Sequence, residues 1–184
     1  MATETEKFTR QNDEVFYTTS ALTEIGITDI SWLKDRARET RRRRARICAH
    51  PDPDAGLHEM LIVHEKDTYV PPHRHIGRSE SYTIIEGAMR IVLFDEAGSI
   101  EDVIAMTTLD QGGCFFYRLS GSQFHSMTID SEWVVFHEVT SGPFDPATTE
   151  FAPWIPAPDD MDAQTEFMTR LIKRIGQGGR TTDG

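Results

Sequence analysis

The sequence predicts an all-β domain of the barrel or sandwich class, with one short helix before it and one after it. Between about residues 46 and 144, short apolar runs alternate with turn residues, which is the pattern of a sheet-rich core. A chain of 184 residues suits one compact domain. The apolar runs cover residues 60–63, 82–85, 89–94, 103–106, 114–119 and 133–139.

The first helix is expected from residue 31 to about residue 43. Trp32, Leu33 and Ala37 recur there at helical spacing, and Asp29 or Ser31 can serve as the N-cap.

The second helix is expected over residues 162–175, where Phe167, Leu171 and Ile175 form one apolar stripe. These helices divide the chain into an N-terminal extension (1–45), a β core (46–145) and a Pro-rich segment with helix and tail (146–184). We expect both ends of the chain, about residues 1–14 and the Gly-rich tail from 176, to be poorly ordered.

The charge balance excludes several classes of partner. A net charge of −11 repels nucleic-acid phosphates and anionic lipids. No apolar run approaches the length that spans a bilayer, and the N-terminus has no signal-peptide pattern. We therefore expect a cytoplasmic protein that binds neither nucleic acid nor membrane. Cys48 and Cys114, the two cysteines, are expected as free thiols in that compartment.

The segment around residues 72–87 carries the clearest chemistry. His73 and His75 stand two residues apart, so in a strand they point to the same face. Glu80 follows a short polar loop, and a hairpin there would return its carboxylate beside the two imidazoles. Gly87 would then end the next strand in a tight turn. The spacing His-x-His-x4-Glu-x6-Gly within a β-rich segment predicts a metal site.

A fourth donor is expected from a later strand, and His125 is well placed for it. Imidazoles with one carboxylate suit first-row divalent ions: iron(II), manganese, cobalt, nickel, copper or zinc. Four protein ligands on an ion that prefers six leave about two positions for water, substrate or dioxygen. We expect one divalent ion per chain and favour iron(II).

This spacing resembles the first conserved motif of the cupin superfamily, and Gly113 with the segment 120–125 resembles the second. The second lacks the usual proline, and its glycine-to-histidine interval is one residue long. Within cupins the chain is similar to the WbuC family of cupin-fold metalloproteins, over roughly residues 29–158. The segments that carry this likeness are 37–51, 68–75 and, most specifically, 137–156. The resemblance implies a double-stranded β-helix, or jelly-roll barrel, with a bound metal, in a homodimer.

Other side chains are candidates for the chemistry around such an ion. Tyr82 shares the strand face of Glu80, so it is a candidate acid or a core aromatic, and His50 is a candidate proton carrier or an ordinary loop histidine. Seven arginines fall between residues 36 and 46; a solvated helix face is the simpler interpretation, and an anion site is the alternative. Candidate substrate contacts are Arg44, Arg46, Arg78 and Glu138.

Three functions follow from these patterns. The first is a metal-dependent enzyme, most plausibly an iron(II) oxygenase acting on a small polar metabolite. The second is a metal-assisted isomerase, epimerase or lyase on a sugar-derived substrate, which the occurrence of WbuC proteins in surface-polysaccharide gene clusters favours. The third is a binding protein whose metal orders a ligand pocket without turnover.

Overall fold

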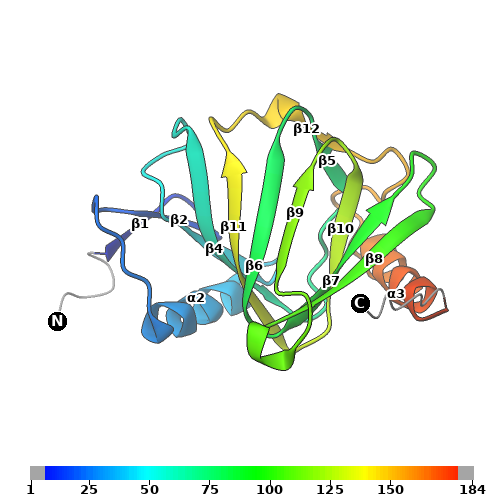
Figure 1. Cartoon of the computed structure of the whole chain (residues 1–184), viewed down its shortest axis with the longest axis horizontal. Helices are drawn as coiled ribbons and strands as arrows, with labels where there is room; N and C mark the ends of the chain where they lie inside the picture. Colours follow the sequence, from blue (N-terminus) through cyan, green and yellow to red (C-terminus); the bar gives the residue numbers. More distant parts are fainter. Residues whose placement is uncertain (1–6, 178–184) are drawn as a thin grey trace.

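The computed structural model describes residues 7–177, which form two opposed β-sheets with one helix on each outer face (Figure 1). The strand order of the larger sheet is β1 (Phe8–Arg10), β2 (Val15–Thr18), β3 (Arg44–Cys48), β4 (Leu57–Glu65), β11 (Trp133–Ser141), β6 (Ser79–Glu86) and β9 (Phe116–Ser120). That of the smaller sheet is β12 (Thr149–Phe151), β5 (His73–His75), β10 (Phe124–Ile129), β7 (Ala88–Phe94) and β8 (Ile100–Thr107).

The described residues confirm a mostly β fold with two flanking helices. Apart from the parallel pair β2–β3, the strand pairs found within residues 7–177 are antiparallel, as in a jelly roll. The two sheets are not closed on each other in this part of the chain, so the closed barrel of the sequence prediction is not shown. Two short 3₁₀ turns, η1 (Leu109–Gln111) and η2 (Pro146–Thr148), complete the connections.

The main core lies between the sheets. Side chains from both contribute to it, such as Ile62 and Phe136 from the larger sheet and Ile91 and Met127 from the smaller. Because side chains alternate along a strand, strands β3, β4 and β11 of the larger sheet send their other face toward α2. Strand β3 illustrates the division: Ala45 and Ile47 pack toward α2, whereas Arg44, Arg46 and Cys48 face the space between the sheets.

Helix α2 spans Ile27–Glu39, about four residues earlier than the predicted 31–43. Gly26 is its N-cap, and the carboxylate of Asp29 accepts a hydrogen bond from the backbone N–H of Gly26 at 2.7 Å. The helix starts early because Ile30 belongs to the buried stripe that includes Leu33. It also ends early, so the arginine run lies mostly in the connection to β3 and in β3 itself.

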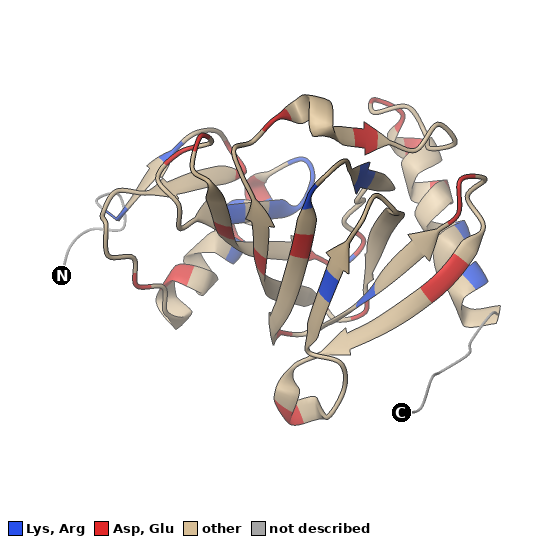
Figure 2. Ribbon diagram, turned by 45° about the horizontal axis from the view of Figure 1, so that its top comes forward, with Lys and Arg blue, Asp and Glu red and all other residues tan. Residues whose placement is uncertain are grey.

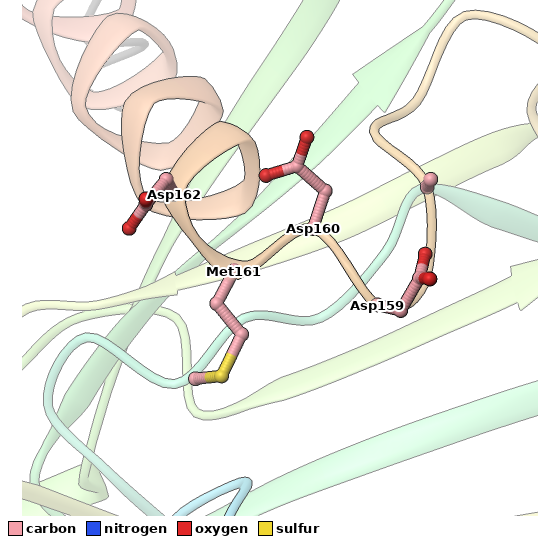
Figure 3. Close-up of a pocket in the computed structure, with 5 residues that line it drawn as sticks. Asp159, Asp160, Met161 and Asp162 are labelled. Carbon is pink, nitrogen blue, oxygen red and sulfur yellow. The ribbon is translucent and has the colours of Figure 1, made fainter.

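Helix α3 spans Met161–Gln177 and confirms the predicted helix over 162–175. Met168, Leu171 and Ile175 pack against the outer face of the smaller sheet. Asp160 precedes the helix, and its side chain accepts a hydrogen bond from the backbone N–H of Ala163 at 2.9 Å (Figure 3). This carboxylate satisfies one of the N–H groups that a helix start leaves without a partner.

The expectation that about residues 1–14 are poorly ordered is wrong for the part of this segment that the structure describes. Residues 8–10 form β1, which pairs with β2 at the edge of the larger sheet, because the buried Phe8 joins the cluster under α2. The remaining residues of that expectation, 1–6, and most of the expected tail, 178–184, lie outside the described residues.

Two surface properties complete the description of residues 7–177. Acidic and basic residues are interspersed over both sheets and both helices (Figure 2). None of the helices in this part of the chain is both long and apolar enough to cross a membrane.

Cys48 is buried and Cys114 is exposed, and both are free thiols, as the sequence predicts.

Candidate metal centre

Three histidines converge from two neighbouring strands of the smaller sheet. His73 on β5 lies directly opposite His125 on β10, and His75 points to the same side as His73 because it is two residues further on. The ring centroids are 4.5 Å apart for His73 and His125 and 4.9 Å apart for His73 and His75. One nitrogen from each of the three rings lies within 4.8 Å of the others, which is a spacing that one ion can span.

Glu80 approaches this cluster from the opposite sheet. Its Oε1 lies 2.8 Å from Nε2 of His125, and its Oε2 lies 3.5 Å from Nε2 of His75. The predicted hairpin is therefore wrong, since β5 and β6 belong to different sheets. The chain crosses between them in the turn at Gly77, which has a φ of +71°. The predicted juxtaposition of the four side chains is nevertheless what the structure shows.

The three imidazoles are oriented by hydrogen bonds at their other nitrogen. Nδ1 of His73 lies 2.8 Å from the carbonyl of Pro71, and Nδ1 of His125 lies 2.9 Å from the carbonyl of Gln123. A carbonyl only accepts, so both Nδ1 atoms carry the proton and both Nε2 atoms keep a lone pair. Nδ1 of His75 lies 3.2 Å from the hydroxyl of Thr149 on β12. This is the arrangement that fixes metal-ligating histidines in proteins.

Three of the atoms in this cluster are buried without hydrogen-bond partners in the described part of the chain. Among residues 7–177, neither carboxylate oxygen of Glu80 nor Nε2 of His125 makes a hydrogen bond of acceptable geometry, although the two groups are in contact. Both side chains are 3% exposed. Buried polar atoms without partners are costly, and a cation between them would satisfy all three. The donor set therefore fits a divalent metal ion.

The electrostatics of the cluster keep His73 and Glu80 in the forms that bind metal. Burial and the neighbouring His125 lower the pKa of His73 to about 3, so this imidazole is neutral at physiological pH. Burial opposes ionisation of Glu80, but its contacts with the His125 and His75 imidazoles outweigh that effect and lower its pKa. The side chain is consequently a carboxylate. For His125, burial is outweighed by the same carboxylate, which raises the pKa of the imidazole.

A cavity of about 240 Å³ opens beside this cluster, between the two sheets. Four of the other predicted site residues line it: Arg44 and Arg46 from β3, Tyr82 from β6 and Glu138 from β11. The alternation along each strand brings these side chains inward, and pairing of Glu138 with Tyr82 in register places them side by side.

Tyr82 and Glu138 are titratable groups of the cavity wall that feel the charge of Glu80. Burial and the Glu80 carboxylate raise the pKa of Tyr82, so its hydroxyl keeps its proton. Its ring also packs against Phe136 at 5.2 Å, so it is a core aromatic as well as a cavity wall. Burial and the charge of Glu80 raise the pKa of Glu138 to about 7, so Glu138 exchanges a proton near neutral pH.

Two candidate residues lie elsewhere. His50, which follows β3, is absent from the described cavity wall, and its ring stacks on His58 with centroids 4.1 Å apart. Arg78 instead donates hydrogen bonds to the backbone carbonyls of Ser141 and Pro143, which anchors the segment after β11. Neither the expected proton transfer by His50 nor substrate contact by Arg78 is supported by this placement.

Two titratable residues of the cavity wall, His64 and Glu14, were not predicted from the sequence. His64 on β4 lies opposite Arg44 in the β3–β4 pair and is buried in the wall. Glu14, which precedes β2, reaches the same place and pairs with arginines. The alternating pattern of β4 is the signal that would have placed His64 inward with Ile62. Nothing in the local sequence marks Glu14.

A second hollow lies at the start of α3, where Asp159, Asp160, Met161 and Asp162 line it (Figure 3). The labelled carboxylates point in different directions rather than toward one point. Among the described residues, the three-histidine group is the only cluster with metal-ligand spacing.

Comparisons with solved structures place this chain beside cupin and double-stranded β-helix proteins. An uncharacterized protein with a double-stranded β-helix domain from Klebsiella pneumoniae has a TM-score of 0.49 and 12% identity, covering 71% of this chain and 98% of its own. A cupin 2 conserved barrel domain protein from Rhodopseudomonas palustris has a TM-score of 0.47 and 16% identity, covering 75% and 80%. A cupin superfamily protein from Desulfitobacterium hafniense has a TM-score of 0.42 and 11% identity, covering 53% and 76%.

One family model also matches, over residues 25–106. It is described as a domain of unknown function, DUF6016, and it includes His73, His75 and Glu80 but not His125. No curated protein matches the chain.

Proposed function

We propose that this protein binds one divalent metal ion through His73, His75, His125 and Glu80, and that it acts as a metal-dependent enzyme on a small polar metabolite. The observation that carries the proposal is the convergence of four side chains from two sheets. Both carboxylate oxygens of Glu80 and Nε2 of His125 are buried without hydrogen-bond partners among residues 7–177, while Nδ1 of His73 and of His125 is held by a carbonyl. The resemblance of residues 29–158 to WbuC cupins agrees with this proposal and adds a homodimer to it.

Iron(II) is the ion we favour, with manganese, cobalt, nickel, copper and zinc as alternatives, because imidazole with one carboxylate suits all of them. When bound, such an ion supplies Lewis acidity and, as iron(II), the capacity to activate dioxygen. The cavity beside the cluster gives a small substrate access to that chemistry. Oxygenase chemistry is therefore our first proposal for the reaction.

The chain itself supplies proton transfer and orientation. The carboxylate of Glu138, with a pKa of about 7, can hold a proton at one oxygen and release it near neutral pH. The Tyr82 hydroxyl stays protonated, so it would be available as a hydrogen-bond donor to a substrate in the cavity. Val70, Met127 and Phe136 add apolar surface to the wall of the same cavity.

Glu138 also favours a second candidate, a metal-assisted isomerase, epimerase or lyase acting on a sugar-derived substrate. A buried carboxyl group that titrates near pH 7 is suited to removing a proton beside a polarised carbonyl. That chemistry needs the metal only as a Lewis acid and uses no dioxygen.

Two measurements on the anaerobically reconstituted iron(II) protein separate these functions. Oxygen uptake that depends on an added metabolite supports the oxygenase. Exchange of substrate hydrogen for solvent deuterium without oxygen supports the isomerase or lyase. Metal-dependent binding of a metabolite with no turnover in either assay contradicts catalysis and assigns a binding protein.

A further inference from the structure

The wall of the cavity opposite the metal cluster carries an unusual set of basic groups. Arg44 and Arg46 are successive inward side chains of β3, and Arg42 precedes them at the cavity rim. Arg42 and Arg44 share one carboxylate, that of Glu14, at 2.6 Å and 3.3 Å. One negative charge thus stands between two guanidinium groups and leaves part of their charge uncompensated.

Arg46 is the least satisfied of these groups. Its Nε is buried and has no hydrogen-bond partner among residues 7–177. A guanidinium nitrogen that is buried in this way is costly unless an acceptor completes the hydrogen bonds of the group. His64, beside Arg44, does not provide a further charge: burial and the nearby arginines lower its pKa, so it is neutral. Nδ1 of His64 is likewise buried without a partner in the described chain.

The formal charges of the cavity also favour an anionic ligand. Three arginines (Arg42, Arg44, Arg46) and three glutamates (Glu14, Glu80, Glu138) are its formally charged side chains among the described residues. They cancel when the histidines are neutral. A divalent ion bound by the cluster adds two positive charges to this balance, so an anionic ligand would restore neutrality.

We propose that the Arg44–Arg46 wall is an oxyanion subsite, and that the substrate of this protein is a small organic anion that reaches from the metal to Arg46. The proposal rests on the metal-binding function above. Guanidinium groups bind carboxylate and phosphate oxygens through paired hydrogen bonds, and both groups share this chemistry. A cavity of about 240 Å³ restricts the ligand to a small metabolite.

Succinate and inorganic phosphate are suitable probes, with uncharged succinamide as the control ligand. Their binding to the Mn²⁺-loaded protein is measured by titration calorimetry, after Mn²⁺ affinity has been measured separately. We expect succinate or phosphate to bind and succinamide to bind at least about tenfold more weakly, since charge-assisted hydrogen bonds are lost. Arg46→Gln should weaken anion binding by at least about tenfold and leave Mn²⁺ affinity within about twofold. The anion affinity of Arg46→Lys should lie between those of wild type and Arg46→Gln, because lysine keeps the charge but loses the planar fork.

Arg170→Gln on the outer face of α3 is the matched control, and it should leave both affinities unchanged. Equal binding of anions by wild type and Arg46→Gln would overturn the subsite, as would failure of both anions to bind or loss of Mn²⁺ from Arg46→Gln. If wild type binds no Mn²⁺, the proposed function fails. The subsite is then judged on the metal-free protein, where Arg46-dependent anion binding supports it and its absence overturns it.

Discussion

His73 and His125 face each other across the β5–β10 pair, with ring centroids 4.5 Å apart, and each ring is held at Nδ1 by a backbone carbonyl two residues away. Both carbonyls, those of Pro71 and Gln123, precede the histidine by two positions. The same local geometry therefore orients two candidate ligands from different strands. The proposed metal binding would need little reorganisation of the imidazoles, because the backbone already sets their orientation.

The turn after β6 depends on Gly87. Gly87 has a φ of +79°, and a Cβ there would lie 2.0 Å from the carbonyl oxygen of Trp133. Gly87→Ala should therefore lower the free energy of unfolding by more than about 2 kcal/mol, through strain and a backbone clash. Gly112→Ala is the matched control, because Gly112 has a similar φ of +76° and open space around it. It should cost only about 1 kcal/mol. If both variants lost the same free energy of unfolding in urea, this role of Gly87 would be contradicted.

The outer face of the smaller sheet depends on α3. Leu171 is 2% exposed within the cluster that includes Val92, Phe94 and Phe124. Leu171→Ala should reduce the free energy of unfolding by about 2–5 kcal/mol, since it leaves a cavity. Ile172→Ala, at a neighbouring position that is 44% exposed, should change it by no more than about 0.5 kcal/mol. Similar effects of the two substitutions in urea unfolding would show that α3 is not docked as described.

The buried His64 predicts an acid-sensitive component of stability. Burial and then the nearby Arg44 lower its pKa well below 6.5 in the folded state. The unfolded chain therefore binds a proton at this group more readily than the folded one. Its stabilising effect is present above about pH 6.5 and is lost as the pH falls below that value, at up to about 1.4 kcal/mol per pH unit.

Replacing His64 by Leu should remove this component. The free energy of unfolding of metal-free His64→Leu should therefore fall less between pH 7 and pH 5 than that of metal-free wild type. His137→Gln, at a partly exposed position near Glu59, should retain the wild-type pH dependence. If the free energy of unfolding of His64→Leu fell as much as that of wild type between pH 7 and pH 5, His64 would be excluded as the source of the acid sensitivity.

The sequence predicts which side chains cluster better than it predicts how the chain brings them together. The alternation of side chains correctly places His73 and His75 on one face. Whether Glu80 returns in a hairpin or on the opposite sheet depends on the path of the chain after Gly77, and both paths satisfy the same spacing. The alternation also orients Glu138 inward, but only sheet order shows that it neighbours Tyr82.

Two very short strands and one arginine-containing strand were the least predictable elements of the fold. Strands β1 and β12 have three residues each, too few for a period-two pattern to stand out. Strand β3 contains Arg44 and Arg46, and charged side chains that face inward do not resemble a strand core. Arg42, Arg44 and Arg46 of the basic run line the cavity, whereas Arg36 and Arg38 lie on α2 and pair with Glu39 and Asp35, as a solvated helix face does.

The metal content of the protein tests the central claim most directly. Wild type and two variants, His125→Gln and Glu80→Gln, are titrated with Mn²⁺ and iron(II) under anaerobic conditions, with His137→Gln as the control. Wild type and the control should bind one ion per chain, and each variant should bind at least about 100-fold more weakly, because a ligand from the centre is lost. No binding by the folded wild type, or unchanged affinity in both variants, would contradict the account.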